Sequence, residues 1–190
     1  MYPRRIWYGE THKVYLTFDD GPHPSITPWL LDFLKKNHVK ATFFWLGSQV
    51  EKHPELYERA LNEGHVVGNH GYNHINGRTM SFENFKKNFE LSYKIINSKL
   101  FRPPYGILTR KQEKYVAKQS KIVMWSWMSY DFDLSLPIEK ILELAQKQIK
   151  SKDILVFHEN EKTTERLKSV LPDVIQVVRG KGYDFDVIKP

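Results

Sequence analysis

Apolar runs of strand length alternate with helical patterns along the whole chain, and this alternation restricts the fold more than any other feature. Val14–Phe18, Ala41–Leu46 and Asp153–Phe157 have the length and the β-forming residues of buried strands. Pro54–Asn62 and Ser81–Ser98 carry apolar residues at helical spacing. Because parallel strands need a crossover segment between them, we expect an α/β fold with about seven mostly parallel strands. The sheet is expected to be either open or closed into a barrel.

The remaining expected elements continue this alternation, with no linker or low-complexity segment between them. They are a helix capped by Thr27 with Pro28 in its first turn, a strand at His65–Gly68, a strand entering Arg102, a helix at Thr109–Gln119, a strand at Ile122–Trp127, a helix at Pro137–Lys150, a helix at Thr164–Arg179 interrupted at Pro172, and a strand at Tyr183–Ile188. Ser81 is the expected N-cap of the long helix that follows it. A length of 190 residues fits one domain, so we expect a single domain over residues 1–190.

The composition excludes several classes of function. The chain has no cysteine, which rules out a disulfide framework, thiolate metal sites and a cysteine nucleophile. Its net charge of +7 favours anionic partners, but the basic residues are scattered apart from Arg4–Arg5 and a face with Lys111, Lys114 and Lys118. We therefore expect no nucleic-acid partner. A basic nucleic-acid binder stays an alternative, and it predicts a steep salt dependence of affinity.

The hydropathy pattern bears on where the protein works. No apolar stretch approaches the length of about 18 residues that a transmembrane helix needs, so no transmembrane segment is expected. The apolar stretch that follows residues 1–5 is too short for a signal peptide. As written, the chain is expected to be cytoplasmic. A chain from which a leader had been removed would look the same and would belong to the cell envelope or be secreted.

Ionisable side chains follow the expected strands at the points where those strands end. They are Asp19 and Asp20, His70 and His74, Arg102, Asp131 next to Phe132, and His158. The carboxyl ends of parallel strands meet at one edge of the sheet, where the ligand site of such folds lies. The strand bodies are apolar, so the polar residues are expected to gather at that edge.

Two pairs of residues at this edge suggest metal binding and proton transfer. Adjacent carboxylates repel each other, but one of Asp19 and Asp20 can hold a cation while the other handles a proton. His70 and His74 lie four residues apart, on one side of a turn. Two imidazoles and one carboxylate form an open metal site, which lowers the pKa of bound water to about 7. In a chain with 8 histidines this spacing also arises by chance, but the glycines and asparagines of the same loop favour the metal interpretation.

His158 and the aromatic residues near it have both a structural and a functional interpretation. A histidine after a strand is often an ordinary surface group, but the apolar strand before His158 would hold it rigidly, as a general acid requires. Trp125, Trp127, Tyr130 and Phe132 form an aromatic cluster that suits either a core or carbohydrate recognition.

The residues at these strand ends resemble the polysaccharide deacetylases with a NodB homology domain, carbohydrate esterase family 4. The five motifs of that family occur in order as Thr17–Pro22 (TFDDGP), His70–His74 (HGYNH), Arg102–Gly106 (RPPYG), Asp131–Phe132 and Val156–His158. The resemblance covers nearly the whole chain. It implies a distorted (β/α) barrel of about seven mostly parallel strands.

The resemblance also implies a role for each matching residue. The metal ligands would be Asp20, His70 and His74. Asp19 would be the catalytic base, paired with Arg102, and His158 the catalytic acid, oriented by Asp131. The backbone N–H of Tyr105 would help to form the oxyanion site, and Phe132 and Val156 would line the pocket for the acetyl methyl group.

Three positions depart from the family pattern. Gly71 replaces a hydroxyl residue of the metal loop, which is expected to loosen that loop. Phe132 replaces a tryptophan and Val156 a leucine, and both changes keep an apolar surface. The chemistry is therefore expected to survive while the shape of the pocket changes.

The expected function is a metal-dependent hydrolase that removes N-acetyl, or O-acetyl, groups from an acetylated carbohydrate such as peptidoglycan or a chitin-like oligosaccharide. The resemblance implies a divalent metal, with Zn²⁺ as the default and Co²⁺ or Ni²⁺ as alternatives. Two other functions stay open: hydrolysis of a non-sugar amide, and carbohydrate binding by a catalytically weak homologue. The sequence does not specify the sugar polymer or the oligomeric state.

Overall fold

The computed structural model describes residues 5–190, so Arg4 of the basic pair and most of the segment weighed as a signal peptide lie outside the described residues. The strands are β1 (Arg5–Ile6), β2 (Lys13–Asp19), β3 (Thr42–Trp45), β4 (Val66–Asn69), β5 (Leu100–Phe101), β6 (Lys121–Val123), β7 (Trp127–Met128), β8 (Ile154–His158) and β9 (Asp184–Phe185). They form one sheet in the order β1-β6-β5-β4-β3-β2-β8-β7, with β9 also paired to β2. Neighbouring strands run parallel, as the alternation with helices predicts.

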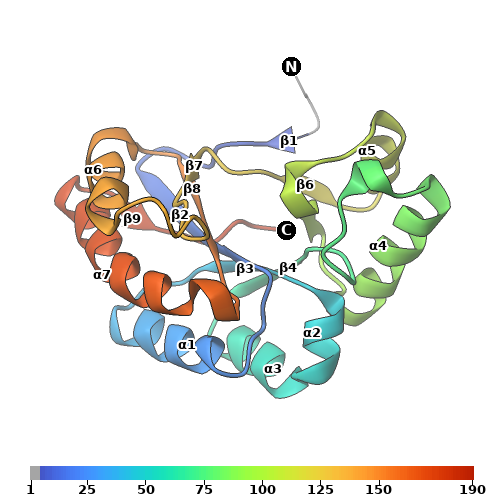
Figure 1. The fold of residues 1–190 in the computed structure, drawn as a ribbon, viewed down its shortest axis with the longest axis horizontal. Helices are drawn as coiled ribbons and strands as arrows, with labels where there is room; N and C mark the ends of the chain where they lie inside the picture. Colours follow the sequence, from blue (N-terminus) through green and yellow to red (C-terminus); the bar gives the residue numbers. More distant parts are fainter. Residues whose placement is uncertain (1–4) are drawn as a thin grey trace.

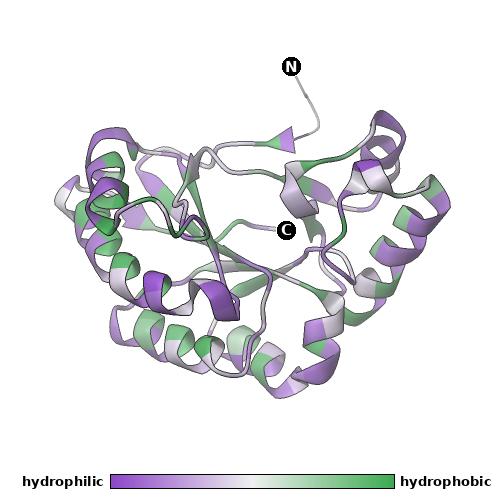
Figure 2. Cartoon of the chain, in the orientation of Figure 1, coloured by the Kyte–Doolittle hydropathy of each residue, from purple (hydrophilic) through white to green (hydrophobic). Residues whose placement is uncertain are grey.

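The helices cover the outer surface of this sheet. They are α1 (Ile26–Lys36), α2 (Gly47–Lys52), α3 (Pro54–Asn62), α4 (Phe82–Ile96), α5 (Arg110–Val116), α6 (Ile138–Gln148) and α7 (Thr164–Gly180). In Figure 1 they follow an arc around the sheet, from α6 and α7 through α1, α3 and α2 to α4 and α5. Figure 2 shows apolar residues on the sides of these helices that face the sheet. Within residues 5–190, no helix is long and apolar enough to cross a membrane.

The segment 121–128 joins the two ends of the sheet. Its first part, β6, pairs with β5 and β1, whereas its last part, β7, pairs with β8 at the other end. Between them, the Met124 N–H donates to the Ile6 carbonyl at 2.7 Å and the Ser126 N–H donates to the Ile154 carbonyl at 3.0 Å. The expected single strand Ile122–Trp127 is therefore wrong, because the chain leaves β6, between β1 and β5 near one end of the sheet, and pairs as β7 with β8 at the other end. This closure gives the distorted barrel that the family resemblance implies.

Strand β2 brings acidic residues to the interior of the barrel. Its residues Val14, Leu16 and Phe18 are fully buried in the main core, against the covering helices. Tyr15 belongs to the separate inner cluster, and the Thr17 hydroxyl bonds to Arg102. Because successive side chains of a strand point to opposite faces, Asp19 continues the inward row at the carboxyl end of β2.

Other elements differ from expectation in ways that tertiary contacts explain. Thr27 lies inside the first turn of α1, and Ser25 occupies the N-cap position, so the expected cap is wrong. The Thr27 hydroxyl instead accepts a hydrogen bond from the His23 N–H at 2.7 Å and donates to Glu159. Helix α7 continues through Pro172 without the expected interruption, and its neighbours Leu171 and Val174 are fully buried.

The last expected strand is shorter than predicted, and one helix was not predicted. Only Asp184–Phe185 of the segment Tyr183–Ile188 pairs with β2, since Ile188 enters the inner cluster and its N–H donates to Thr42. The short helix α2 begins at Gly47, whose N–H donates to the Gly71 carbonyl at 2.9 Å. That contact comes from a distant part of the chain, so local sequence does not reveal it.

Candidate active site

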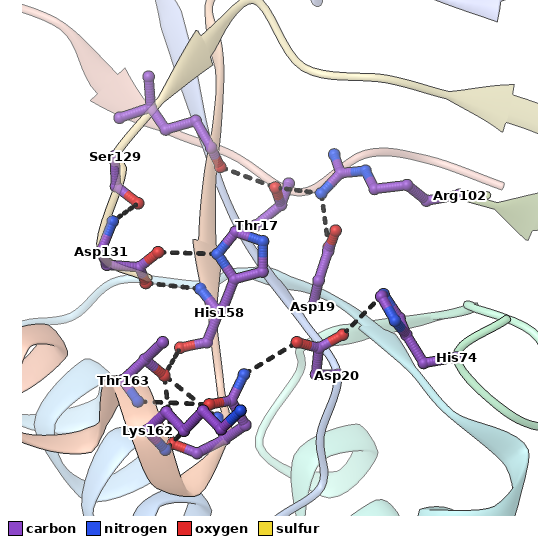
Figure 3. Close-up of polar contacts among 12 residues, drawn as sticks. Thr17, Asp19, Asp20, His74, Arg102, Ser129, Asp131, His158, Lys162 and Thr163 are labelled. Carbon is purple, nitrogen blue, oxygen red and sulfur yellow. Dashed lines mark hydrogen bonds and ion pairs between the residues drawn. The ribbon is translucent and has the colours of Figure 1, made fainter. Parts of the chain in front are cut away.

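The carboxyl ends of the strands surround a cavity of about 410 Å³. Its lining residues are Asp19, Asp20, His70, His74, Tyr105, Trp125, Met128, Phe132, His158 and Asn160. Two further residues singled out from the sequence, Arg102 and Asp131, lie fully buried behind this lining. Figure 3 shows how several of these side chains point toward one another across the barrel.

Asp19 is bound to Arg102 in the interior of the barrel. An Nη1–H of Arg102 donates to Asp19 Oδ1 at 2.7 Å, and the same nitrogen donates to the Thr17 hydroxyl at 2.7 Å. Burial lowers the pKa of the Arg102 guanidinium, and the charge of Asp19 opposes that shift. Buried charges are tolerated when they are paired and hydrogen-bonded, as these are. One oxygen of Asp19 is thereby fixed, while its Oδ2 lies 4.0 Å from His70 Nε2.

Asp20, His70 and His74 form a cluster with the donor atoms of a metal site. Their ligand atoms lie within 4.8 Å of one another. Asp20 Oδ1 is 3.7 Å from His70 Nε2 and 3.4 Å from His74 Nε2. This oxygen is buried and, within residues 5–190, has no hydrogen-bond partner. Two imidazole nitrogens and a carboxylate oxygen suit Zn²⁺ and similar divalent ions, so the residues present fit such a metal.

The protonation of His70 also suits a metal ligand. Its Nδ1 lies 2.7 Å from the Arg102 carbonyl oxygen, which can only accept, so Nδ1 carries the hydrogen and Nε2 has a free lone pair. Burial, the largest effect, lowers the pKa of His70 to about 3, so the ring is neutral at physiological pH. A histidine whose other nitrogen donates to a carbonyl is the usual arrangement at metal centres.

The loop that carries these histidines is tied to the rest of the protein. Gly71 has a φ of +85°, and a Cβ at this position would lie 2.8 Å from Asn88 Nδ2. Its N–H donates to Asn69 Oδ1 at 2.6 Å, and the Asn73 N–H donates to Asn88 Oδ1 at 2.9 Å. The left-handed backbone and these asparagine contacts account for glycine at position 71. They hold the loop without a hydroxyl side chain there.

His158 is oriented and charged by Asp131. Its Nδ1 and its backbone N–H each lie 2.7 Å from an oxygen of that carboxylate. Burial lowers the pKa of His158, but the hydrogen bond and charge of Asp131, with smaller effects of Asp19 and Asp20, outweigh burial and raise this pKa to about 9. The ring is therefore an imidazolium at neutral pH. The Phe132 ring lies perpendicular to it, with 5.2 Å between the ring centroids.

Tyr105 lies across the cavity mouth on a strained turn. Its φ is +59°, a left-handed value that is rare for a residue with a Cβ. The hydrogen bonds of this turn run from Gly106 to Pro103 and from Ile107 to Pro104, and they do not use the Tyr105 N–H. Tyr105 is 59% exposed, and the centroid of its ring lies 4.5 Å from that of His74.

The apolar wall of the cavity differs in part from the sequence-based interpretation. Trp125 and Met128 line the wall together with Phe132. Val156 is 1% exposed and lies opposite Thr17, one inward-facing layer below the Asp19–His158 pair. The role in the acetyl pocket that the resemblance implies for Val156 stays a prediction. Trp125 was noted only as part of an aromatic cluster, and no sequence signal marked Met128 or Asn160.

Comparisons with known proteins agree in both sequence and structure. The profile of the family described as Polysaccharide deacetylase matches residues 8–124, which is more than half of the chain. A peptidoglycan-N-acetylglucosamine deacetylase of Bacillus cereus is 35% identical over 182 residues, covering 90% of this chain and 84% of that protein. Other curated relatives are longer, and the chain spans 46% of one and 38% of another.

Solved structures share the fold over nearly the whole chain. The structure of a peptidoglycan N-acetylglucosamine deacetylase has a TM-score of 0.92 at 31% identity, covering 97% of this chain and 91% of that one. A pseudoenzyme of the CE4 family from Bacillus anthracis has a TM-score of 0.85 at 26% identity, covering 97% of this chain and 67% of that one. Because the fold occurs in an enzyme and in a pseudoenzyme, activity depends on the residues at the cavity and not on the fold alone.

Proposed function

Because this chain belongs to the polysaccharide deacetylase family, carbohydrate esterase family 4, we propose that it removes N-acetyl groups from peptidoglycan. Its relatives are named for deacetylation of peptidoglycan amino sugars, and deacetylation is hydrolysis of an amide bond. Peptidoglycan lies in the cell envelope, so this substrate would place the site of action there.

The observation that carries the proposal is that three functional groups converge on one cavity. They are an aspartate fixed by an arginine, an aspartate clustered with two histidines, and a histidine charged by a third aspartate. Amide hydrolysis needs a base for the attacking water, a positive centre for the carbonyl oxygen and an acid for the leaving nitrogen. A protein that only binds carbohydrate would need none of these three groups.

Asp20, His70 and His74 would hold the divalent metal, with Zn²⁺ as the default and Co²⁺ or Ni²⁺ as alternatives. When bound, such an ion polarises the acetamide carbonyl and lowers the pKa of water. The protein's own groups would carry the proton transfers. Asp19, held at Oδ1 by Arg102, takes the proton of the attacking water at Oδ2.

The remaining groups act on the oxyanion and on the leaving amine. The N–H of Tyr105, which the hydrogen bonds of its turn do not use, would donate to the developing oxyanion, where a preorganised donor is usually worth most. His158, charged and oriented by Asp131, donates its Nε2 proton to the sugar nitrogen as the C–N bond breaks. Acetate and a free amine are the products. Trp125, Met128 and Phe132 would contact the acetyl methyl group.

Acetate release combined with metal analysis tests this function. The substrates are peptidoglycan, a chitooligosaccharide and acetylated xylan, each assayed with untreated protein, with chelated protein and after Zn²⁺ is restored. We expect acetate from peptidoglycan, loss of activity on chelation and recovery with Zn²⁺. Protein that contains metal but releases no acetate from any of the three would refute the proposal. It would then favour a non-sugar amide substrate or a binding role.

A further inference from the structure

The turn after β8 contains an asparagine whose amide has a defined orientation. Asn160 Oδ1 accepts hydrogen bonds from the backbone N–H groups of Lys162 at 3.1 Å and Thr163 at 3.3 Å. The backbone N–H of Asn160 donates to the Thr163 hydroxyl oxygen at 3.3 Å, which completes a capping box. Because the oxygen faces two backbone donors, the amide nitrogen must point away from them, toward the cavity.

That nitrogen is directed at Asp20. Asn160 Nδ2 donates to Asp20 Oδ2 at 3.0 Å, a contact drawn in Figure 3 between Asp20 and the turn. The reverse orientation of the amide would place its oxygen against a carboxylate and its NH₂ group against backbone N–H groups. The capping contacts therefore ensure that a donor, and not an acceptor, faces this carboxylate.

The contact distinguishes the two oxygens of Asp20. Oδ2 is occupied by Asn160, whereas Oδ1 is the buried oxygen that faces His70 Nε2 and His74 Nε2. Asp20 has a φ of +81°, so it lies outside the regular geometry of β2 and the strand alone does not set its side-chain direction. Asn160 is the described neighbour that donates to this carboxylate through a side chain.

We propose that Asn160 is a positioning residue that holds Asp20 so that a single oxygen, Oδ1, is presented to the metal. The inference rests on the proposed function, since it concerns the same metal site, but it concerns affinity and coordination and not turnover. A carboxylate held in advance loses less freedom on binding than one that must be ordered by the ion. Partners of this kind typically change metal affinity by about 10- to 100-fold.

Asn160→Ser separates positioning from folding. Serine is a good helix-capping residue, so the turn keeps an acceptor for the backbone N–H groups, but its side chain provides no amide donor for Asp20. Ser81→Ala is the control. Ser81 caps α4 through the Asn84 N–H, and its loss weakens a helix terminus away from the cavity.

The readouts are the Zn²⁺ dissociation constant from competition with a chelator and the visible absorption spectrum of the Co²⁺-loaded protein. We expect Asn160→Ser to bind Zn²⁺ about 10- to 100-fold more weakly than the wild type and to show a changed Co²⁺ spectrum. Ser81→Ala should match the wild type in both. The thermal midpoint of the metal-free proteins reports folding separately.

Zn²⁺ affinity within about twofold of the wild type and an unchanged Co²⁺ spectrum in Asn160→Ser would overturn the inference. A wild-type protein that binds metal and releases acetate, with that result for the variant, would leave the proposed function intact. A wild-type protein that binds neither Zn²⁺ nor Co²⁺ would overturn the inference and the proposed metal site together.

Discussion

Replacing Asp131 by asparagine tests whether a buried carboxylate sets the charge of the proposed catalytic acid. Asp131 is fully buried and accepts two hydrogen bonds from His158, one from the ring and one from the backbone. Asparagine has nearly the same shape and keeps one acceptor oxygen, but it removes the negative charge. We therefore expect Asp131→Asn to fold and bind metal while the pKa of His158 falls.

The size of the effect follows from the pKa of His158. Its pKa is about 9, compared with an ordinary value of 6.5. The difference corresponds to about 3 kcal/mol in favour of the imidazolium. If the pKa returns to its ordinary value, the protonated fraction at pH 8 falls from about 0.9 to about 0.03. The acid is then missing from most molecules, and kcat/KM at that pH should fall about 30-fold.

The assay is acetate release across a range from about pH 6 to about pH 10, with kcat/KM fitted at each pH. The alkaline limb should move to lower pH in Asp131→Asn. Asp133→Asn is the matched control, because it makes the same chemical change two positions away. The Asp133 carboxylate accepts a hydrogen bond from the Ser135 hydroxyl and not from His158. An unchanged alkaline limb in a folded, metal-containing Asp131→Asn protein would refute the assignment of Asp131 as the group that charges His158.

The remaining predictions concern the base, one metal ligand and a buried carboxyl group. Asp19→Asn should lower kcat by about 10²- to 10⁴-fold while keeping bound Zn²⁺, as measured by acetate release and metal analysis. Turnover that persists in this variant would contradict the assignment of Asp19 as the base. His74→Ala should lose both metal and activity, and near-stoichiometric Zn²⁺ in the purified variant would argue against that ligand. Burial raises the pKa of Glu159 to about 8 against an ordinary 4.5, with the Thr27 and Trp45 hydrogen bonds opposing it. The native protein therefore keeps a proton that the unfolded chain releases, and stability should fall by up to about 5 kcal/mol as pH rises through that interval. The free energy of unfolding, measured with urea at several pH values, should fall less with rising pH in Glu159→Gln than in the wild type. An equal dependence on pH in both proteins would exclude the explanation.

The sequence predicts the elements of this fold best where local pattern and tertiary contacts agree. The helix expected at Pro54–Asn62 is observed with the same bounds, because Pro54 starts it and its apolar residues repeat at helical spacing. The segment Ile122–Trp127 has the composition of one strand, but its two halves pair with opposite ends of the sheet. No local pattern encodes that division, since it depends on where the barrel closes.

A similar limit applies to the candidate site. Ionisable residues at strand ends, such as Asp19 and His158, can be found from the sequence because parallel strands bring their carboxyl ends together. Asn160 and Met128 line the same cavity without any spacing or motif that marks them. Their positions depend on which residue faces them across the barrel, and this information is contained only in the folded chain.

Arg102 connects the chemistry of the site to the completeness of the fold. Besides Asp19 and Thr17, its guanidinium donates to the Met124 carbonyl at 2.8 Å and to the Val123 carbonyl at 3.4 Å, both in the segment that joins the two ends of the sheet. The guanidinium thus holds together the proposed base, Asp19, and the segment 121–128 that joins the two ends of the sheet. Its partners come from two distant parts of the chain, residues 17–19 and 123–124, so these hydrogen bonds can form only after the long-range contacts of the barrel have formed. A molecule in which the segment 121–128 has not joined the sheet would hold Asp19 without its alignment. Catalytic activity would therefore report that the last long-range contacts are in place.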